Sequence, residues 1–352
     1  MSRGNTSVIA GIALLFVNAL IPMAIAQDED WQSTLKQDIE KIDESFPGEL
    51  GVYIRHLGDN RTVAHNADRD WYLASTIKIP LGIVLMQRAE NEDLDLEQKL
   101  TLRAGDYVDG TGDLLWVEPG AQYSLEELNK RSIEDSDSTA TDMLIRYLGE
   151  EAFNDQVTEL MPEGFGPITT ILQVRYDAYS EVHPDVSVLT NRDFIDLKTV
   201  NTGNARYEML LEKLGISKAQ ADAKSVQEAF ERYYKRGINS GNLEAFGQLL
   251  ERLVDGELLD DSHTERLLGY MAGITTGDNR IAGGLEDDVR FAHKTGTQVA
   301  RSCDIGVLNP QVPDQAVVVA VCAEDYDALS DAEKAYQAVG KALTRAGLPV
   351  GT

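Results

Sequence analysis

The stretch "WYLASTIKIPLG", residues 71–82, places Ser75 three positions before Lys78. On a helix, side chains three apart share one face, so Ser75 could be a nucleophile and Lys78 its base. The apolar run "IPLGIVLM" begins directly after this lysine and predicts that Lys78 is buried at the start of a helix. Burial in a low dielectric disfavours an ammonium group, and a neutral Lys78 could then accept the proton of Ser75.

The same pattern occurs earlier, where Ser33 precedes Lys36 in "STLK". A chain of this length is expected to hold roughly one such motif by chance, so the pattern alone decides nothing. No strand is predicted before Ser33, and Leu35 belongs to the apolar stripe of an ordinary charged helix. We therefore interpret Ser33 as a surface residue and Ser75 as the candidate nucleophile.

Two further triplets follow downstream. Residues 136–138, "SDS", precede a predicted helix, where Asp137 or Ser138 alone would be an ordinary N-cap. Residues 294–297, "KTGT", lie in a predicted strand, where a lysine alone could protect an exposed sheet edge. The order S-x-x-K, then S-D-x, then K-T-G is much rarer than any one of the three.

With all three motifs, the chain resembles the class A β-lactamases and their penicillin-binding relatives over roughly residues 30–350. The gap of about sixty residues between Ser75 and Ser136 is similar to the family spacing. The gap to Lys294 is longer than usual, and a helical, charged block at about 185–238 has the right size to account for the excess. The resemblance implies an α+β, serine β-lactamase/D,D-peptidase-like fold with an antiparallel five-stranded sheet flanked by helices.

The resemblance also implies the role of each motif. Ser75 would be the acylated nucleophile, Lys78 its base, and Ser136 the group that passes a proton to the leaving nitrogen. The backbone N–H groups of Ser75 and Thr297 would form the oxyanion hole, where each donor is worth roughly 3 kcal/mol. The substrate would be bound by Ser138, Lys294, Thr295, Gly296 and Thr297.

The sequence departs from the family pattern at two places. Ser138 replaces an asparagine, which puts substrate selectivity in doubt because a hydroxyl is shorter and has fewer donors. The E-x-x-L-N pattern of the deacylating glutamate is missing. By position Asp177 is similar to that glutamate, with Glu181 slightly beyond, although an ion pair between Arg175 and Asp177 explains the same residues. Without a water-activating carboxylate the acyl-enzyme would persist.

Tyr107 precedes a glycine-rich loop and resembles, by position, an aromatic wall over the substrate. The alternative is a packed loop aromatic, since amphipathic rings readily fill such places. The five histidines have no paired ligand spacing, so we expect no metal, and we expect no other cofactor.

The order of predicted elements gives the domain organisation. Residues 49–66 alternate around a turn and predict a β-hairpin, and further strands are predicted near residues 290–323. Helices dominate between these regions, with capping boxes predicted at Ser124 and Ser330. We expect a sheet part at about 27–82 and 283–352, a helical part at about 83–282, and the extra insertion at about 185–238.

Residues 1–26 have the charged start, apolar run and small-residue end of a signal peptide, cut before Gln27. We therefore expect a secreted or periplasmic protein, monomeric and without a stable membrane anchor. The formal net charge of −27 would repel nucleic acid.

Cys303 and Cys322 flank a turn-like loop, and we expect either a cross-strand disulfide or two buried thiols.

These observations favour a serine hydrolase that opens β-lactam rings through an acyl-enzyme on Ser75. The alternatives are a D,D-peptidase or esterase acting on peptidoglycan-like substrates or small esters, and a penicillin-binding sensor that is acylated without turnover. All of these proteins would be acylated on the same nucleophile, Ser75. The residues that complete deacylation therefore distinguish the β-lactam hydrolase from the alternatives.

Overall fold

The computed structural model describes Met1, residues 30–200 and residues 203–348. The predicted signal peptide therefore lies outside the described residues, apart from Met1. Over the described part of the chain, no helix is both long enough and apolar enough to cross a membrane.

A five-stranded antiparallel sheet forms the centre of the molecule, with the strand order β2-β1-β9-β8-β7. It combines strands from both chain ends, because β1 pairs with β9 along its full length. The predicted hairpin at residues 49–66 and the five-stranded architecture are confirmed. The strands are β1 Glu49–His56, β2 Arg61–His65, β7 Phe291–Gln298, β8 Arg301–Leu308 and β9 Val317–Glu324.

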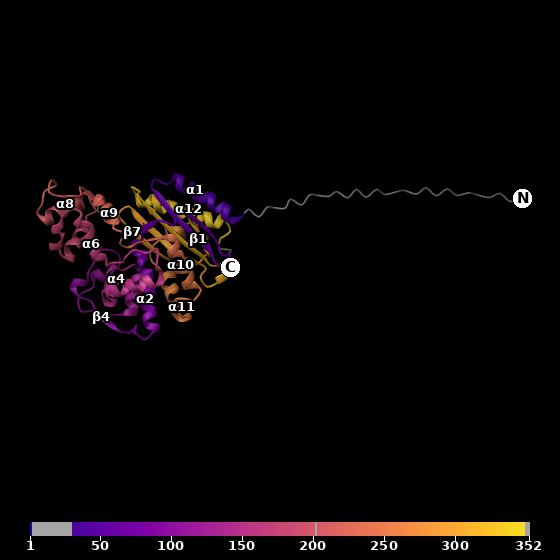
Figure 1. Ribbon diagram of the computed structural model, residues 1–352, viewed down its shortest axis with the longest axis horizontal. Helices are drawn as coiled ribbons and strands as arrows, with labels where there is room; N and C mark the ends of the chain where they lie inside the picture. Colours follow the sequence, from indigo (N-terminus) through magenta and orange to yellow (C-terminus); the bar gives the residue numbers. More distant parts are fainter. Residues whose placement is uncertain (2–29, 201–202, 349–352) are drawn as a thin grey trace.

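One face of the sheet is covered by the two terminal helices, α1 (Trp31–Ser45) and α12 (Leu329–Arg345) (Figure 1). Successive side chains of a strand point to opposite faces, and β9 supplies apolar residues to both. Val319 and Val321 join the core under α12, whereas Val318 and Ala320 join the core on the other side. Both faces are covered, which explains the uninterrupted apolar run of this strand.

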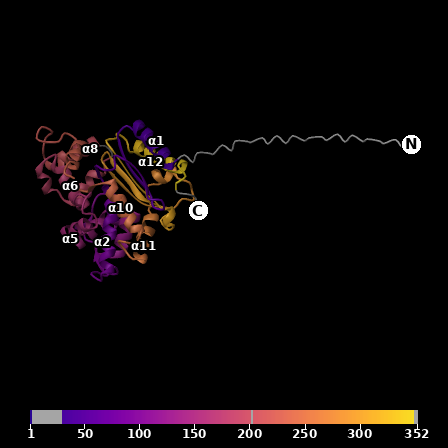
Figure 2. The same ribbon diagram turned by 45° about the vertical axis from the view of Figure 1, so that its right-hand side comes forward.

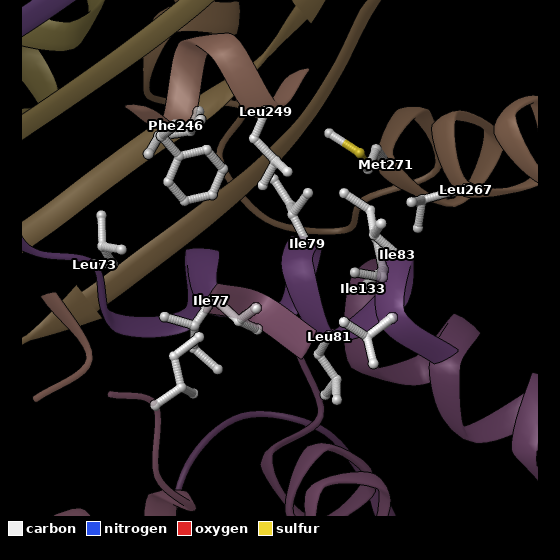
Figure 3. Packing of buried hydrophobic residues seen from close by; sticks show 14 of the residues in the cluster. Leu73, Ile77, Ile79, Leu81, Ile83, Ile133, Phe246, Leu249, Leu267 and Met271 are labelled. Carbon is white, nitrogen blue, oxygen red and sulfur yellow. The ribbon is translucent and has the colours of Figure 1, made fainter. Parts of the chain in front are cut away.

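The other face carries the helical part of the chain, beginning with α10 (Leu243–Val254). Figure 3 shows Ile79 and Ile83 of α2 lying among Phe246 and Leu249 of α10, with Leu267 and Met271 close by. The neighbouring helices are α2 Lys78–Glu90, α3 Leu125–Glu134, α4 Ser138–Leu148, α5 Glu150–Leu160 and α11 Asp261–Ala272.

Four further helices form a lobe beside the sheet, seen next to β7 in Figure 1 and at the left in Figure 2. They enclose a core of their own, in which Tyr179, Phe194, Phe230 and Tyr233 are buried. The helices are α6 Ile171–Ser180, α7 Asn191–Lys198, α8 Gly203–Leu214 and α9 Val226–Tyr234. Most of this lobe is the predicted insertion.

Short elements connect these layers. Two small antiparallel pairs join β3 to β6 and β4 to β5. Their bounds are β3 Asp70–Tyr72, β4 Lys99–Thr101, β5 Gln122–Ser124 and β6 Ser240–Asn242. The 3-10 turns are η1 Ala74–Ile77, η2 Ala104–Asp106, η3 Leu114–Trp116, η4 Pro184–Val188, η5 Ile281–Gly284 and η6 Pro313–Gln315.

Of the two predicted capping boxes, only the first is confirmed. The Ser124 hydroxyl accepts from the backbone N–H of Glu127, whose carboxylate accepts from the Ser124 N–H in return. The box at Ser330 is wrong, because α12 begins one residue earlier, at Leu329. Ser330 therefore lies inside the first turn rather than at the cap.

Cys303 of β8 faces Cys322 of β9 across the antiparallel pair, and the two form a disulfide. Of the two predicted alternatives, the cross-strand disulfide is therefore the correct one. The bond links β8, which also pairs with β7, to β9, which also pairs with β1. It therefore joins the C-terminal strands at the point where the N-terminal hairpin is attached.

The core between α10 and α2 predicts a measurable cost of truncation. Phe246 has no exposed surface, so Phe246→Ala should lower the free energy of unfolding by about 3–5 kcal/mol through lost burial and a residual cavity. Gln248→Ala, at an exposed position of the same helix, should change it by less than about 0.5 kcal/mol. Urea unfolding of both variants measures the difference, and equal small losses would contradict this packing.

Candidate active site

The candidate nucleophile lies in the turn η1, directly before α2. Ala74 adopts a φ of 48°, a left-handed conformation that residues with a Cβ rarely take. Such backbone strain concentrates at functional sites. Ser75 follows and lines a cavity of about 820 Å³, together with Lys78, Ser136, Ser138, Thr295 and Thr297.

Strand β7 approaches this turn so closely that only glycine fits at position 296. A Cβ there would lie 2.5 Å from the Leu73 carbonyl oxygen and 3.0 Å from the backbone nitrogen of Ser75. The glycine of the K-T-G motif therefore permits the sheet edge to touch the nucleophile turn. This contact places the backbone of residues 296–297 beside that of Ser75, as an oxyanion hole built from both would require.

Lys78 is fully buried, and its Nζ donates to the Ser136 carbonyl oxygen at 2.7 Å and to the Ser136 hydroxyl at 3.1 Å. Burial lowers the pKa of Lys78 to about 7, against the opposing effect of Asp137 and Asp142. The amine can therefore be neutral near pH 7 and offer a lone pair. Among the described residues, the Ser75 hydroxyl has no hydrogen-bond partner that would compete for its proton.

The S-D-S segment is held in a fixed conformation. Ser136 has a φ of 53°, and its carbonyl oxygen accepts a second bond from the Thr111 hydroxyl at 2.5 Å. Asp137 is the N-cap of α4, because its carboxylate accepts from the Ala140 N–H at 2.8 Å. The other oxygen of this carboxylate accepts from the Leu114 N–H at 3.0 Å, which anchors the loop opposite.

Lys294 is also fully buried, although its strand β7 is an edge of the sheet. Its Nζ donates to the Thr295 carbonyl oxygen at 3.0 Å. Burial, the nearby Lys78 and Arg280 all lower the pKa of Lys294, while Asp304 opposes them. Lys294 is therefore a buried residue near Lys78 and Arg280 and does not protect an exposed edge.

Two residues of the site escaped the sequence analysis. Arg280 is buried, lines the cavity, and donates to the Thr297 hydroxyl at 2.5 Å and to the Gly296 carbonyl oxygen at 2.9 Å. No motif marks it, since it lies in an irregular segment before η5. It adds a cation directly behind the K-T-G residues.

The second is Asp142, a fully buried carboxylate on α4. Its oxygens accept from the backbone N–H groups of Ile171 at 2.7 Å and Leu172 at 2.9 Å, which are the first residues of α6. Burial raises the pKa of Asp142 to about 6, against these two bonds. Asp142 thus fixes α6 beside the site, a role that only the tertiary contact reveals.

The structure does not bring Asp177 into the cavity. Its carboxylate accepts from the Gln173 side chain at 2.9 Å and lies 3.7 Å from Arg236. Glu181 pairs with Arg236 as well. The alternative ion pair with Arg175 is wrong, because Asp177 pairs with Arg236 instead. Asp177 is also not among the residues that line the cavity, so the structure gives no support to its predicted deacylating role, which stays a prediction.

Arg175 instead pairs with Asp109, its Nε donating to both carboxylate oxygens at 2.7 and 2.9 Å. The two partners are 66 residues apart in the sequence, so motif spacing could not predict their ion pair. The pair joins α6 to the loop before the S-D-S segment and lies within the cavity wall.

Tyr107 does not form a wall over the substrate. It is buried in the core and its hydroxyl donates to the Val117 carbonyl oxygen at 2.5 Å. The alternative interpretation, a packed loop aromatic, is therefore the correct one.

One group of side chains in the described part of the chain could offer three ligand atoms to a metal ion, namely Glu90, Asp260 and His263. None of them lines the cavity, and the His263 ring already bonds Asp260 at 3.0 Å. The group is separate from the motifs described above.

The three motifs thus converge on one cavity, around a serine beside a buried lysine, as in serine acyl-transfer enzymes. A family model described as the β-lactamase enzyme family matches residues 34–346. The chain belongs to this family.

A relative agrees with this assignment, and solved structures share the fold. A β-lactamase of Bacillus licheniformis is 27% identical over 319 residues, which cover 90% of this chain and 84% of the relative. The crystal structure of a β-lactamase from Sphaerobacter thermophilus superposes with a TM-score of 0.64 at 22% identity, covering 90% of this chain and 98% of that one. An acyl-enzyme complex of a PBP-A mutant with penicillin G gives 0.64 at 21% identity, covering 89% and 96%.

The buried pair of Arg175 and Asp109 predicts an asymmetric response to mutation. Asp109→Ala should destabilise the protein by about 3–5 kcal/mol, because it leaves the guanidinium buried without its partner. Arg175→Met combined with Asp109→Ala should recover most of this loss, because no buried charge then remains unpaired. Denaturant unfolding of the single and double variants decides the point; additive losses would show that the two side chains do not interact.

Proposed function

We propose that this protein is a class A-type serine β-lactamase that opens the lactam ring through an acyl-enzyme on Ser75. The observation that carries the proposal is the buried amine of Lys78, one residue past the nucleophile turn and 3.1 Å from the Ser136 hydroxyl. A base, a nucleophile and a second proton carrier then face one cavity.

Acylation follows from these positions. Neutral Lys78 takes the Ser75 proton as Oγ attacks the lactam carbonyl carbon. The carbonyl oxygen becomes an oxyanion, which the backbone N–H groups of Ser75 and Thr297 stabilise. When the C–N bond breaks, the Ser136 hydroxyl gives its proton to the nitrogen and is reprotonated by Lys78.

The other end of the substrate is bound by the K-T-G strand. Thr295 and Thr297 offer hydroxyls in the cavity, and Arg280 lies behind Thr297. A carboxylate next to the lactam nitrogen would be held by these hydroxyls in the field of Arg280 and Lys294. Charge-assisted hydrogen bonds of this kind are roughly twice as strong as neutral ones.

Neither Asp177 nor Glu181 lines the cavity, and we propose that the base of deacylation is a different residue. We propose that Lys78, again neutral after acylation, also activates the water that attacks the ester. With Lys78 as the base of both reactions, deacylation should be slower than acylation, because no carboxylate is positioned to activate the water. The acyl-enzyme should therefore accumulate during turnover.

The cellular setting is part of the proposal. The signal peptide predicted from the sequence at residues 1–26 supports secretion or a periplasmic location. A monomer is sufficient, because one chain holds all the proposed groups. A D,D-peptidase or a non-catalytic sensor would share acylation of Ser75 but not sustained lactam turnover.

Rapid mixing with a chromogenic cephalosporin should give a burst of one product per enzyme, followed by slower continuous turnover. Ser75→Ala should abolish both phases, and Asp177→Asn should leave both unchanged within about twofold, because its carboxylate lies outside the cavity. Intact-mass spectrometry after quenching checks the adduct. A stable adduct without turnover would favour the sensor or peptidase, and absence of any adduct would remove the hydrolase proposal.

The pKa of Lys78 sets the pH dependence of acylation. Since burial lowers it to about 7, the reactive neutral form increases as the pH rises through 7. The second-order acylation constant should therefore rise about tenfold per pH unit below 7 and level off near pH 8. Stopped-flow measurement from pH 5 to 9 tests this; a constant that keeps rising to pH 9 would mean that the lysine remains charged near neutrality.

A further inference from the structure

The cavity does not end at the catalytic motifs. It extends under the lobe of α6 to α9, where Lys198, Arg206 and Phe230 of the inserted helices line it. Arg175 and Tyr179 of α6 line the same region. The insertion therefore contributes side chains to the wall of the cavity that holds Ser75.

The charge of this cavity is opposite to that of the whole chain. The protein has 59 acidic and 32 basic residues. Among the residues that line the cavity, however, the cations outnumber the carboxylates. The cations, apart from Lys78, which acts as a neutral amine, are Arg175, Lys198, Arg206 and Arg280, and the carboxylates are Asp109 and Glu333. A local positive field inside an acidic protein attracts anions selectively to this cavity.

The two cations from the insertion are not neutralised by neighbours. Neither Lys198 nor Arg206 forms an ion pair with a described residue. The Arg206 Nε donates to the Leu197 carbonyl oxygen at 3.2 Å, and the guanidinium also interacts with the uncharged Tyr179 hydroxyl. The acidic residues of α7, which lie close in sequence, are already engaged. Asp193 and Asp196 bind the Lys213 ammonium at 2.8 and 2.9 Å.

Arg175 strengthens the positive field. Its Nε is occupied by Asp109, but its Nη1 is buried without a hydrogen-bond partner among the described residues. The pKa of Lys198 is lowered by surrounding protein atoms and by Arg175 and Arg206, against Asp109. Lys198 is an exposed residue, so its ammonium is accessible to an anion that enters from solvent.

These cations come from other elements than the cation behind the K-T-G group. Lys198 and Arg206 come from α7 and α8 of the lobe, whereas Arg280 lies behind Thr297 at the sheet edge. Both groups line the cavity that also holds Ser75. A substrate bound at Ser75 could therefore contact both groups.

We propose that the inserted helices form a second anion-binding subsite, in which Lys198 and Arg206 bind a carboxylate at the distal end of the substrate's acyl side chain. This inference rests on the proposed function and narrows its substrate class. The preferred substrates are dianions, with one carboxylate beside the lactam nitrogen and another on an ω-carboxyalkanoyl side chain. In such a substrate, the flexible acyl side chain extends from Ser75 into the lobe, and its terminal carboxylate forms an ionic contact there. A substrate with a neutral acyl side chain would occupy the same space without that ionic contact.

The test uses cephalosporins acylated with succinyl, glutaryl or adipoyl groups, each compared with its ω-methyl ester. Three chain lengths scan the reach to Lys198 and Arg206. For at least one length, the wild-type protein should show kcat/KM at least about tenfold higher for the acid than for the ester, as expected of a hydrogen-bonded charge pair. In Lys198→Gln combined with Arg206→Gln, this ratio should fall to about one while the value for the ester stays within about twofold.

Lys235→Gln is the matched control, since Lys235 lies on the same lobe, is exposed and does not line the cavity. It removes a positive charge without touching the proposed subsite, so the acid-to-ester ratio should be unchanged. An equal ratio for acid and ester at every length in the wild type would overturn the subsite. A ratio lowered equally by the control would overturn it too, because general charge would then be the cause.

Binding to Ser75→Ala separates the two proposals, because this variant needs no chemistry. Equilibrium dialysis should give a lower Kd for the acid than for the ester, and the Lys198→Gln and Arg206→Gln changes should abolish the difference. If wild-type Ser75 reacts with neither compound, the proposed function is lost, and dialysis still decides the subsite. If both react at equal rates and bind equally, only the subsite is lost.

Discussion

The site depends on one constraint: an amine must be buried without a carboxylate at hydrogen-bond distance. Lys78 meets this constraint because α2 is apolar around it and buries it completely. Its only hydrogen bonds among the described residues go to Ser136, whose strained backbone presents both its carbonyl and hydroxyl oxygen to the amine. Asp137 and Asp142 lie near enough to influence Lys78, but their oxygens are used by backbone N–H groups.

The sheet supplies the second half of the site. Because β1 from the start of the chain pairs with β9 from its end, the edge strand β7 is brought beside the turn that carries Ser75. The contact is possible only with a glycine at 296. Burying Lys78 and Lys294 in one region costs stability, since burial disfavours both charges and Lys78 further disfavours the charged form of Lys294. The fold offsets this cost through two large apolar cores on the sheet faces.

Local pattern was enough to predict the hairpin, the sheet from both chain ends, the cross-strand disulfide as one of two alternatives, and the burial of Lys78. It also predicted that Ser75, Ser136 and Lys294 belong together, because motif order carries that information. It failed where a role depends on helical register or on a partner far along the chain. Asp177 has the right chemistry at the right position, but its carboxylate pairs with Arg236 rather than with Arg175. Asp142 and Arg280 gain their roles from backbone groups of other segments, which no spacing reveals. The contribution of Lys198 and Arg206 to the cavity is hidden in the same way.

The proposed mechanism requires that Lys78 can be a neutral amine near pH 7 in the folded protein. The most direct measurement is a titration of its side chain by NMR, following the Cε resonance in protein labelled with ¹³C-lysine and assigned with Lys78→Arg. We predict a midpoint near 7, well below that of an ordinary lysine. A midpoint above 10 would show that the amine is charged at neutral pH, and Lys78 could then not be the base that activates Ser75.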